Sequence, residues 1–288
     1  MSDILRPCVY LLISRADADD MKRSLPAVFP TGGQPGAWLS PSDLSRHLTS
    51  PARLITADSL WDCWTHWDTE LYEIETRPES ASVEDAAEWS AMRLVRRVEG
   101  WNPTSLWHFA CDQVEDRLYY VTTYLPEETR AAEAVRVARR FADGDAATED
   151  LDAAREAARV LFFEVPELLV SVMQASEEER RAARARCATR AAMLIATPDQ
   201  QGEAVGTRAR MAVEEAFQAH CLNAAGWIAA NVVGRQREAA LCRHVGVGSP
   251  EEIKAIGNGR TLDGGWRRVR HAQSLDMNEV VDLTSPEE

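Results

Sequence analysis

Lysine is almost absent from this chain, with Lys22 and Lys254 the only two among 288 residues. Arginine supplies the remaining positive charge, and 46 acids against 32 bases give a formal net charge of -14. Proteins that bind nucleic acid directly carry basic faces that release counterions from the phosphates. The charge balance therefore predicts that this protein does not bind nucleic acid directly.

Long apolar runs and cysteine pairs are also missing. No run approaches the roughly eighteen apolar residues of a membrane span, and CVYLLIS near the start is too short for a secretory signal. Scattered cysteines without a CxxC pair indicate free thiols in a reducing compartment. We therefore expect a cytoplasmic protein without a membrane segment. The six cysteines are Cys8, Cys63, Cys111, Cys187, Cys221 and Cys242.

Acidity is concentrated in the N-terminal part of the chain. Residues 1–130 carry 21 acids against 12 bases, and ten acids but only one base lie between Asp58 and Glu88. Within that stretch, DSLWDCWTHWDTELYEIE (residues 58–75) contains three tryptophans at a spacing of three. Read as a helix capped by Asp58, the segment places the tryptophans on one broad face, together with Asp68 and Glu75.

Two interpretations of this tryptophan segment remain open. In the first, the tryptophans are core, and Asp68 and Glu75 pair with arginines of the next expected helix (residues 82–100), where Arg93, Arg96 and Arg97 lie. In the second, the segment presents an aromatic, acidic surface to a basic partner protein. The residues predicted to contact that partner are Trp61, Trp64, Trp67, Asp68, Glu73 and Glu75.

The rest of the chain is dominated by helical patterns. Residues 8–14 form a short apolar run that fits a strand or a buried N-terminal segment. A capping serine, Ser40, precedes Pro41 and starts a short helix, and residues 104–125 fit helical spacing. Further helices are expected from Pro126 to Gly144, from Thr148, from the capping box of Ser176 and Glu179, over residues 207–244, and from Pro250.

Two stretches carry a family resemblance. HFACDQVEDRLYYV, followed by AVRVARRFADGDAATEDLDAAREAARVL, shows an (H/R)FAxDxxE-type helix before an ARR(F/Y)xxGxA-type helix end. These residues, with the later AGWIAANVVGRQREAALCRHVG, resemble the alanine-rich helical immunity proteins of polymorphic-toxin loci and some phages. The resemblance covers His108 to Val165 and Cys221 to Val245. It implies an all-α fold that binds and neutralises a toxin stoichiometrically, and it leaves the tryptophan segment unexplained.

Catalytic and metal chemistry find little support in the residue spacing. His220 beside Cys221, and Cys242 two residues from His244, point in different directions on a helix, so we expect no metal site. Cys63 near His66 lies in an acidic surrounding, which opposes a reactive thiolate. Asp68 and Glu75 are the best carboxylate pair, about 10 Å apart along a helix. The loop TGGQPG lacks the lysine of a phosphate loop, and no cofactor is expected.

Together these patterns predict an all-α or mainly α protein. An antiparallel bundle of alanine-rich helices (residues 104–256) would follow a smaller Trp-rich N-terminal portion (residues 1–103) and precede a loop and acidic tail (residues 257–288). The predicted function is non-enzymatic protein binding of the immunity or anti-defence type, blocking a basic partner such as a nuclease or toxin. Alternatives are a helical enzyme with a carboxylate or cysteine site near the tryptophans, and a phage structural or assembly protein. The tail VVDLTSPEE also resembles a SUMO-interacting motif.

Overall fold

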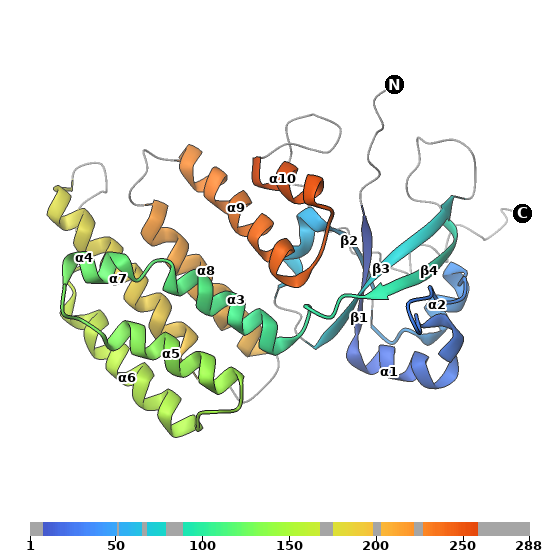
Figure 1. Ribbon diagram of the computed structural model, residues 1–288, viewed down its shortest axis with the longest axis horizontal. Coiled ribbons are helices and arrows are strands. Elements are labelled where there is room, and N and C mark those ends of the chain that lie inside the picture. Colours follow the sequence, from blue (N-terminus) through green and yellow to red (C-terminus); the bar gives the residue numbers. More distant parts are fainter. Residues whose placement is uncertain are drawn as a thin grey trace, which may run out of the picture. The chain divides into compact units, whose positions relative to one another are not determined.

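The structure, a computed structural model, describes residues 8–50, 52–64, 68–78, 89–167, 175–197, 203–221 and 227–258. The chain divides into two compact units (Figure 1). The first comprises Met1–Cys63, Asp68–Trp101 and Glu238–Glu288, and the second comprises Trp64–Trp67 and Asn102–Arg237. One boundary between the units therefore lies at residues 101 and 102. The return of the chain to the first unit at Glu238 is not part of the predicted division.

The first unit contains a four-stranded antiparallel sheet in the order β2-β1-β3-β4. Central strand β1 pairs Leu11 with Leu54 on one side and with Tyr72 on the other. Strand β4 is an edge strand, and Leu39 exchanges backbone hydrogen bonds with Met92 there. The strands are β1 (Val9–Ser14), β2 (Arg53–Thr56), β3 (Thr69–Pro78) and β4 (Trp89–Arg97).

One face of this sheet carries an apolar core of the unit. Leu11 and Ile13 of β1, Tyr72 and Ile74 of β3, and Met92 and Leu94 of β4 alternate along their strands and point to that face. Met21, which is fully buried, packs against them. The elements on this face are α1 (Arg15–Ser24), η1 (Pro26–Val28) and α2 (Pro41–His47).

Residues from the end of the described chain complete the same unit. The Cys242 thiol donates to the Ala57 carbonyl at 3.1 Å, and the Gly248 amide donates to the Tyr10 hydroxyl at 2.7 Å. Glu252, only 3% exposed, accepts a hydrogen bond from the Cys8 amide at 2.8 Å. The elements involved are η2 (Ala57–Cys63), the end of α9 (Trp227–Val245) and α10 (Pro250–Asn258).

The second unit is helical. Helix α7 packs against α3, α4, α5, α6 and α8. Its contact faces are largely alanine, with Ala185, Ala188 and Ala191 fully buried, so that neighbouring helices approach closely. The helices are α3 (Pro103–Glu115), α4 (Tyr119–Tyr124), α5 (Arg130–Ala142), α6 (Thr148–Glu164), α7 (Glu177–Ile195) and α8 (Glu203–Cys221).

Several local predictions are confirmed. Ser40 caps α2 by accepting from the Asp43 amide, and Ser176 forms the predicted capping box with Glu179 at the start of α7. Residues 8–14 contain a strand, and a helix begins at Pro250. The helical pattern of residues 104–125 is realised as two helices, α3 and α4. The mainly α prediction holds, whereas a wholly α fold is wrong because of the sheet.

The predicted helix over residues 58–75 is also wrong. Residues 57–63 form the 3-10 helix η2, and residues 69–78 form strand β3. Of the three tryptophans only Trp61 lies in η2, because Trp64 follows its end and Trp67 lies outside the described residues. In β3 the side chains of Glu70, Leu71 and Tyr72 are all buried, because the strand lies inside the sheet. Burial on both faces hides the period of two that marks an exposed strand.

The helix expected over residues 82–100 is wrong as well. Its described part is strand β4, Trp89–Arg97, which pairs with β3. Met92 and Leu94 are buried two residues apart, which is strand spacing, whereas the helical interpretation relied on Met92, Val95 and Val98. The segment contains too few apolar residues for its sequence alone to distinguish the helical period of 3.6 from the strand period of two.

Candidate functional site

The two described tryptophans among the predicted contacts are not at the surface. Trp61 is 4% exposed and Trp64 is fully buried, whereas Trp67 lies outside the described residues. The Trp64 indole donates to the Gly206 carbonyl at 3.2 Å, and its ring lies 5.3 Å from the ring of Phe109. Both described tryptophans are core side chains, because each buries its large apolar ring within a folded unit.

The predicted contact acids are paired with arginines. Glu75 pairs with Arg93 at 2.5 Å, and Glu73 pairs with Arg96 at 2.6 Å, across the β3-β4 ladder. Asp68, with a side chain 78% exposed, lies 3.8 Å from Arg15. All three arginines that the sequence suggests as internal partners therefore do meet acids of this segment, Arg97 through Glu70. These ion pairs join neighbouring strands of a sheet, whereas the sequence predicted that they would join two helices.

Glu70 is the most buried acid of the segment. It is 4% exposed and accepts hydrogen bonds from Lys22 at 2.8 Å and from the Tyr72 hydroxyl, with Arg97 at 3.2 Å. Burial alone would raise the pKa of Glu70, but hydrogen bonds from Lys22 and Tyr72 and the charge of Arg97 lower it below 4.5. The carboxylate is thus a charged anchor between α1, β3 and β4.

The groups proposed for an enzymatic alternative are not brought together. Cys63 is fully buried, and burial raises the pKa of its thiol to about 11. Burial likewise raises the pKa of Cys111 to about 12. Seven residues of extended chain span roughly 23 Å, so Asp68 and Glu75 do not face one substrate. Among the described residues, no cluster of three His, Cys, Asp or Glu side chains could hold a metal ion.

An exposed acidic and apolar stripe occurs instead on α6. Leu151, Ala154, Ala158 and Leu161 form its buried stripe. On the opposite side, Phe163 is 64% and Val160 is 40% exposed. Spacings of three and four continue this outer stripe toward the start of the helix. We call it the α6 outer face, and it consists of Glu149, Asp152, Glu156, Val160 and Phe163.

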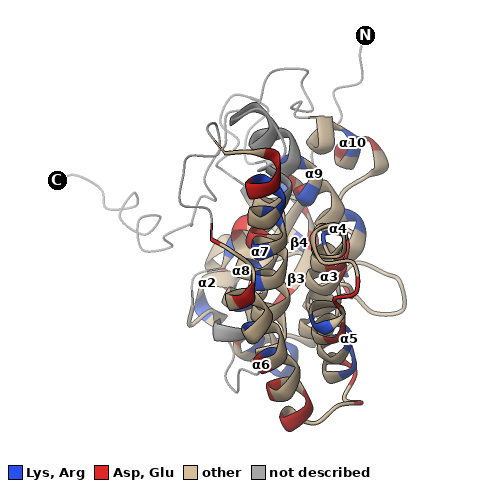
Figure 2. Cartoon of the chain, turned by 90° about the vertical axis from the view of Figure 1, so that its left-hand side faces the viewer, with Lys and Arg blue, Asp and Glu red and all other residues tan. Residues whose placement is uncertain are grey.

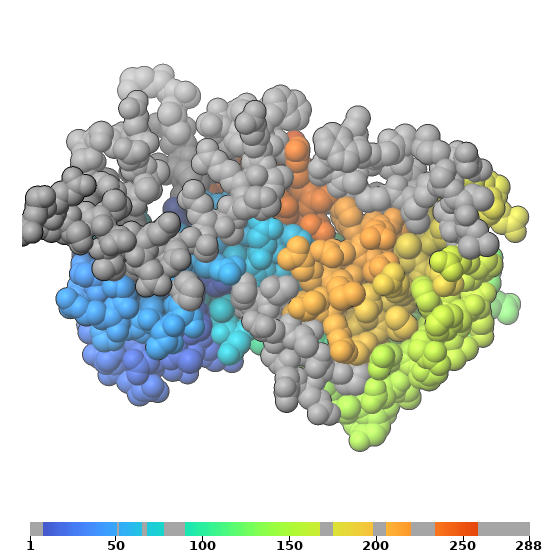
Figure 3. Space-filling view, turned by 180° about the vertical axis from the view of Figure 1, so that it is seen from behind, coloured from blue at the N-terminus to red at the C-terminus, as the bar shows by residue number. Residues whose placement is uncertain are grey.

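The figures show how this face is presented. In Figure 2 acidic residues gather at the start of α6. In Figure 3 the yellow-green residues of α6 lie open along one side of the helical unit. The sequence did contain a signal for this face, because Val160 and Phe163 are apolar residues that lie off the buried stripe of the helix.

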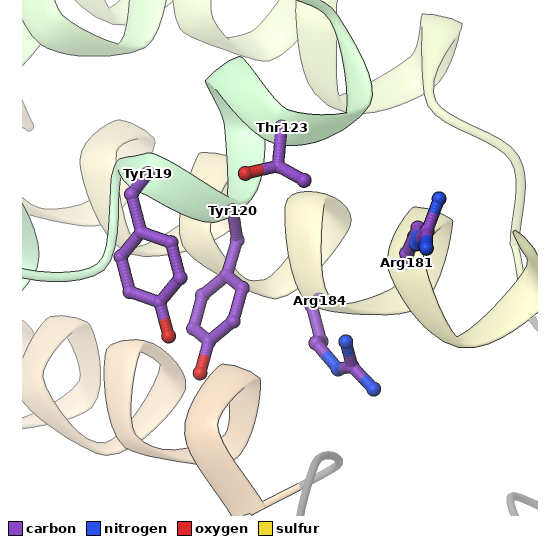
Figure 4. A pocket seen from close by; sticks show the side chains of 5 residues that line it. All are labelled: Tyr119, Tyr120, Thr123, Arg181 and Arg184. Atoms are coloured by element: carbon purple, nitrogen blue, oxygen red, sulfur yellow. The ribbon is translucent and has the colours of Figure 1, made fainter. Parts of the chain in front are cut away.

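A shallow pocket of about 120 Å³ lies where α4 packs against α7 (Figure 4). Tyr119 and Tyr120 project from α4 with their rings 4.0 Å apart, and their hydroxyls point to the same side as the guanidinium of Arg184. Spacings of three place Tyr120 with Thr123, and Arg181 with Arg184, on one face of each helix. The lining residues are Tyr119, Tyr120, Thr123, Arg181 and Arg184.

Comparison with protein-family models, with curated proteins and with solved structures finds no match to this chain. Among the described residues, no helix is both long enough and apolar enough to cross a membrane.

Proposed function

We propose that this chain is a non-enzymatic protein-binding protein of the immunity or anti-defence type, which blocks a basic partner such as a nuclease or toxin. In this proposal the second unit acts as an antiparallel helical bundle that holds the contact surface rigid. The protein acts in the cytoplasm, where its free thiols stay reduced.

One observation carries the proposal, namely the exposure of Phe163 in line with three acids on the α6 outer face. Aromatic side chains anchor protein interfaces, and acidic groups around them steer a basic partner into place. The family resemblance covers α6, since it extends from His108 to Val165. The α6 outer face replaces the tryptophan segment as the contact surface, because Trp61 and Trp64 are buried.

Association kinetics with a purified partner test the proposal. Replacing Val160 by a photo-cross-linking residue captures the partner for identification. With that partner, Phe163→Ser should weaken binding by about 2 kcal/mol, mainly through faster dissociation. The triple variant Glu149→Gln, Asp152→Asn, Glu156→Gln should slow association about tenfold and flatten its dependence on salt.

A matched triple variant distinguishes this surface from the one predicted by sequence. Asp68→Asn, Glu73→Gln and Glu75→Gln remove the same number of acids from β3 and the turn before it. This variant should change the association rate far less than the α6 variant does. If the β3 variant has the larger effect, or if Phe163→Ser binds as the unchanged protein does, the α6 outer face is not the contact surface.

A further inference from the structure

The pocket between α4 and α7 has an electrostatic character unlike that of the acidic chain around it. Among the described residues, its lining includes two arginines and no acid. One of them, Arg184, is only 8% exposed, which is rare for a charged residue, and its guanidinium lies 6.0 Å from the centre of the Tyr120 ring. Its burial indicates that the surrounding residues hold the guanidinium in place rather than leaving it in solvent.

The partners of Arg184 within the protein are incomplete. Its Nη1 reaches the carboxylate of Glu177 at 3.4 Å, which is long for a charged hydrogen bond. Its Nε also has no hydrogen-bond partner among the described residues, but this atom is enclosed by protein, so only the Nη donors can reach a ligand in the pocket. Glu177 is also shared with Arg180 at 3.2 Å and with Arg181 at 3.5 Å. One carboxylate therefore serves three guanidinium groups, which leaves donor capacity unused at the pocket.

The other lining residues add neutral donors. Tyr119 is 49% exposed, whereas Tyr120 is 5% exposed. Burial, and then a hydrogen bond with Tyr119, raise the pKa of Tyr120 far above its usual value, so its hydroxyl keeps its proton and donates it to Tyr119, which leaves the Tyr119 hydroxyl as the donor for a ligand. Thr123 contributes a further hydroxyl at the rim. Donors thus come from both helices, and the exposed ring of Tyr119 adds an aromatic wall.

We propose that this pocket binds the phosphoryl group of a phosphate monoester. A phosphoryl group offers three strongly accepting oxygens and about two negative charges, which suits several donors from two directions. A carboxylate has only two oxygens and would be satisfied by a single guanidinium fork. The volume of about 120 Å³ accommodates the phosphoryl group, with the remainder of the ester lying against Tyr119 or in solvent. This site is independent of the α6 outer face.

Titration of the full-length protein with phenyl phosphate tests the proposal, followed by NMR of labelled tyrosines. Saturable shifts of Tyr119 and Tyr120 are expected, with a dissociation constant below about 10 mM. O-phosphoserine in a parallel titration distinguishes a phosphorylated side chain from an aromatic ester, and binding of either supports a phosphoryl site. Benzoate provides the carboxylate comparison. The absence of saturable shifts with both phosphate esters, or equal affinity for benzoate, would overturn the proposal.

Variants on α7 locate the site within the pocket. Arg181→Gln should weaken phenyl phosphate binding roughly threefold to tenfold, whereas Arg180→Gln, which removes the same charge outside the pocket lining, should change it little. Glu177→Gln removes the competing carboxylate and should strengthen binding. Tyr119→Phe, at a half-exposed position, should weaken binding without unfolding the protein. Equal effects of Arg180→Gln and Arg181→Gln would show non-specific charge attraction and contradict the assignment.

Discussion

The carboxylate of Glu70 joins three elements of the sheet unit through side chains alone. Lys22 reaches it from α1, Arg97 from β4, and Tyr72 from the same strand. The side chain of Glu70 is 4% exposed, whereas the side chains of Lys22 and Arg97 are 36% and 38% exposed. Removing the negative charge therefore leaves two cations that can turn only partly toward water, with a buried phenol beside them.

Replacing Glu70 by glutamine should lower the free energy of unfolding of the sheet unit by about 2–3 kcal/mol. The amide cannot pair with two cations, and part of the desolvation cost of the site remains. Glu73→Gln is the matched control, because Glu73 pairs with a single arginine that is 51% exposed. That control should cost less than about 1 kcal/mol. Urea denaturation of both variants measures the difference.

The contribution of Glu70 should also depend on pH. Because its pKa in the folded protein lies below the ordinary value of 4.5, its charge stabilises the folded state above pH 4.5. The stabilisation is lost as the pH falls through the lowered folded pKa. The stability difference between the unchanged protein and Glu70→Gln should therefore be constant near neutral pH and shrink below pH 4.5. A difference that persists at pH 2 would show that charge is not its origin.

At the scale of elements, the backbone just after β4 lies so close to the end of α9 that it limits which residue can occupy position 100. A Cβ added at Gly100 would lie 2.5 Å from the carbonyl oxygen and 2.6 Å from the Cα of Val245, at the end of α9. These are backbone atoms, which cannot move aside as a flexible side chain can. Glycine is therefore required at this position for a steric reason.

Gly100→Ala should destabilise the sheet unit by about 1–3 kcal/mol, because the added methyl group overpacks the contact with Val245. Gly234→Ala is the opposite case, since no atom of the described residues outside the adjoining turns of α9 lies within 4 Å of an added Cβ there. In the middle of α9 that exchange should stabilise the protein by about 0.5–1 kcal/mol through helix propensity. Thermal unfolding monitored by circular dichroism distinguishes the two. A loss of stability in both variants would contradict the steric explanation for Gly100.

At the scale of the whole molecule, the first unit is built from segments far apart in the sequence. The amide of Cys8 and the carboxylate of Glu252 are separated by 244 positions, yet they form a hydrogen bond of 2.8 Å. The chain leaves this unit after Trp101 and returns at Glu238. The sheet therefore depends on residues that lie more than 130 positions after β4 in the sequence.

A chain ending at Arg237 should lose protection of the sheet, whereas a chain ending at Asn258 should keep it. The shorter chain lacks the Gly248 amide that donates to Tyr10 and the Glu252 carboxylate that holds Cys8. Both chains lack residues 259–288, so their difference isolates residues 238–258. Hydrogen exchange followed by mass spectrometry should show faster exchange in β1 and β3 of the shorter chain, but little change in α5. Equal exchange in the two chains would show that residues 238–258 are dispensable for the sheet.

Local chemistry allowed the sequence alone to predict most of the helical elements. The start of α2 depends on the hydroxyl of Ser40, and that of α7 on the reciprocal bonds of Ser176 and Glu179. Such signals act within three residues and need no tertiary partner. The alanine-rich buried face of α7 could likewise be predicted, because alanine recurs along that single segment of the sequence.

Only the tertiary structure decided the nature of the tryptophan segment. Strand β3 forms because β1 and β4 supply its hydrogen-bonding partners, and its burial on both faces removes the alternation that sequence patterns rely on. Pairing of Glu73 and Glu75 with arginines depends on the register of β3 and β4, and the burial of Glu70 depends on α1. The pocket of Arg184 likewise requires α4 to pack on α7. Each of these features depends on contacts between segments that are far apart in the sequence. Neither segment alone indicates which other segment it will contact.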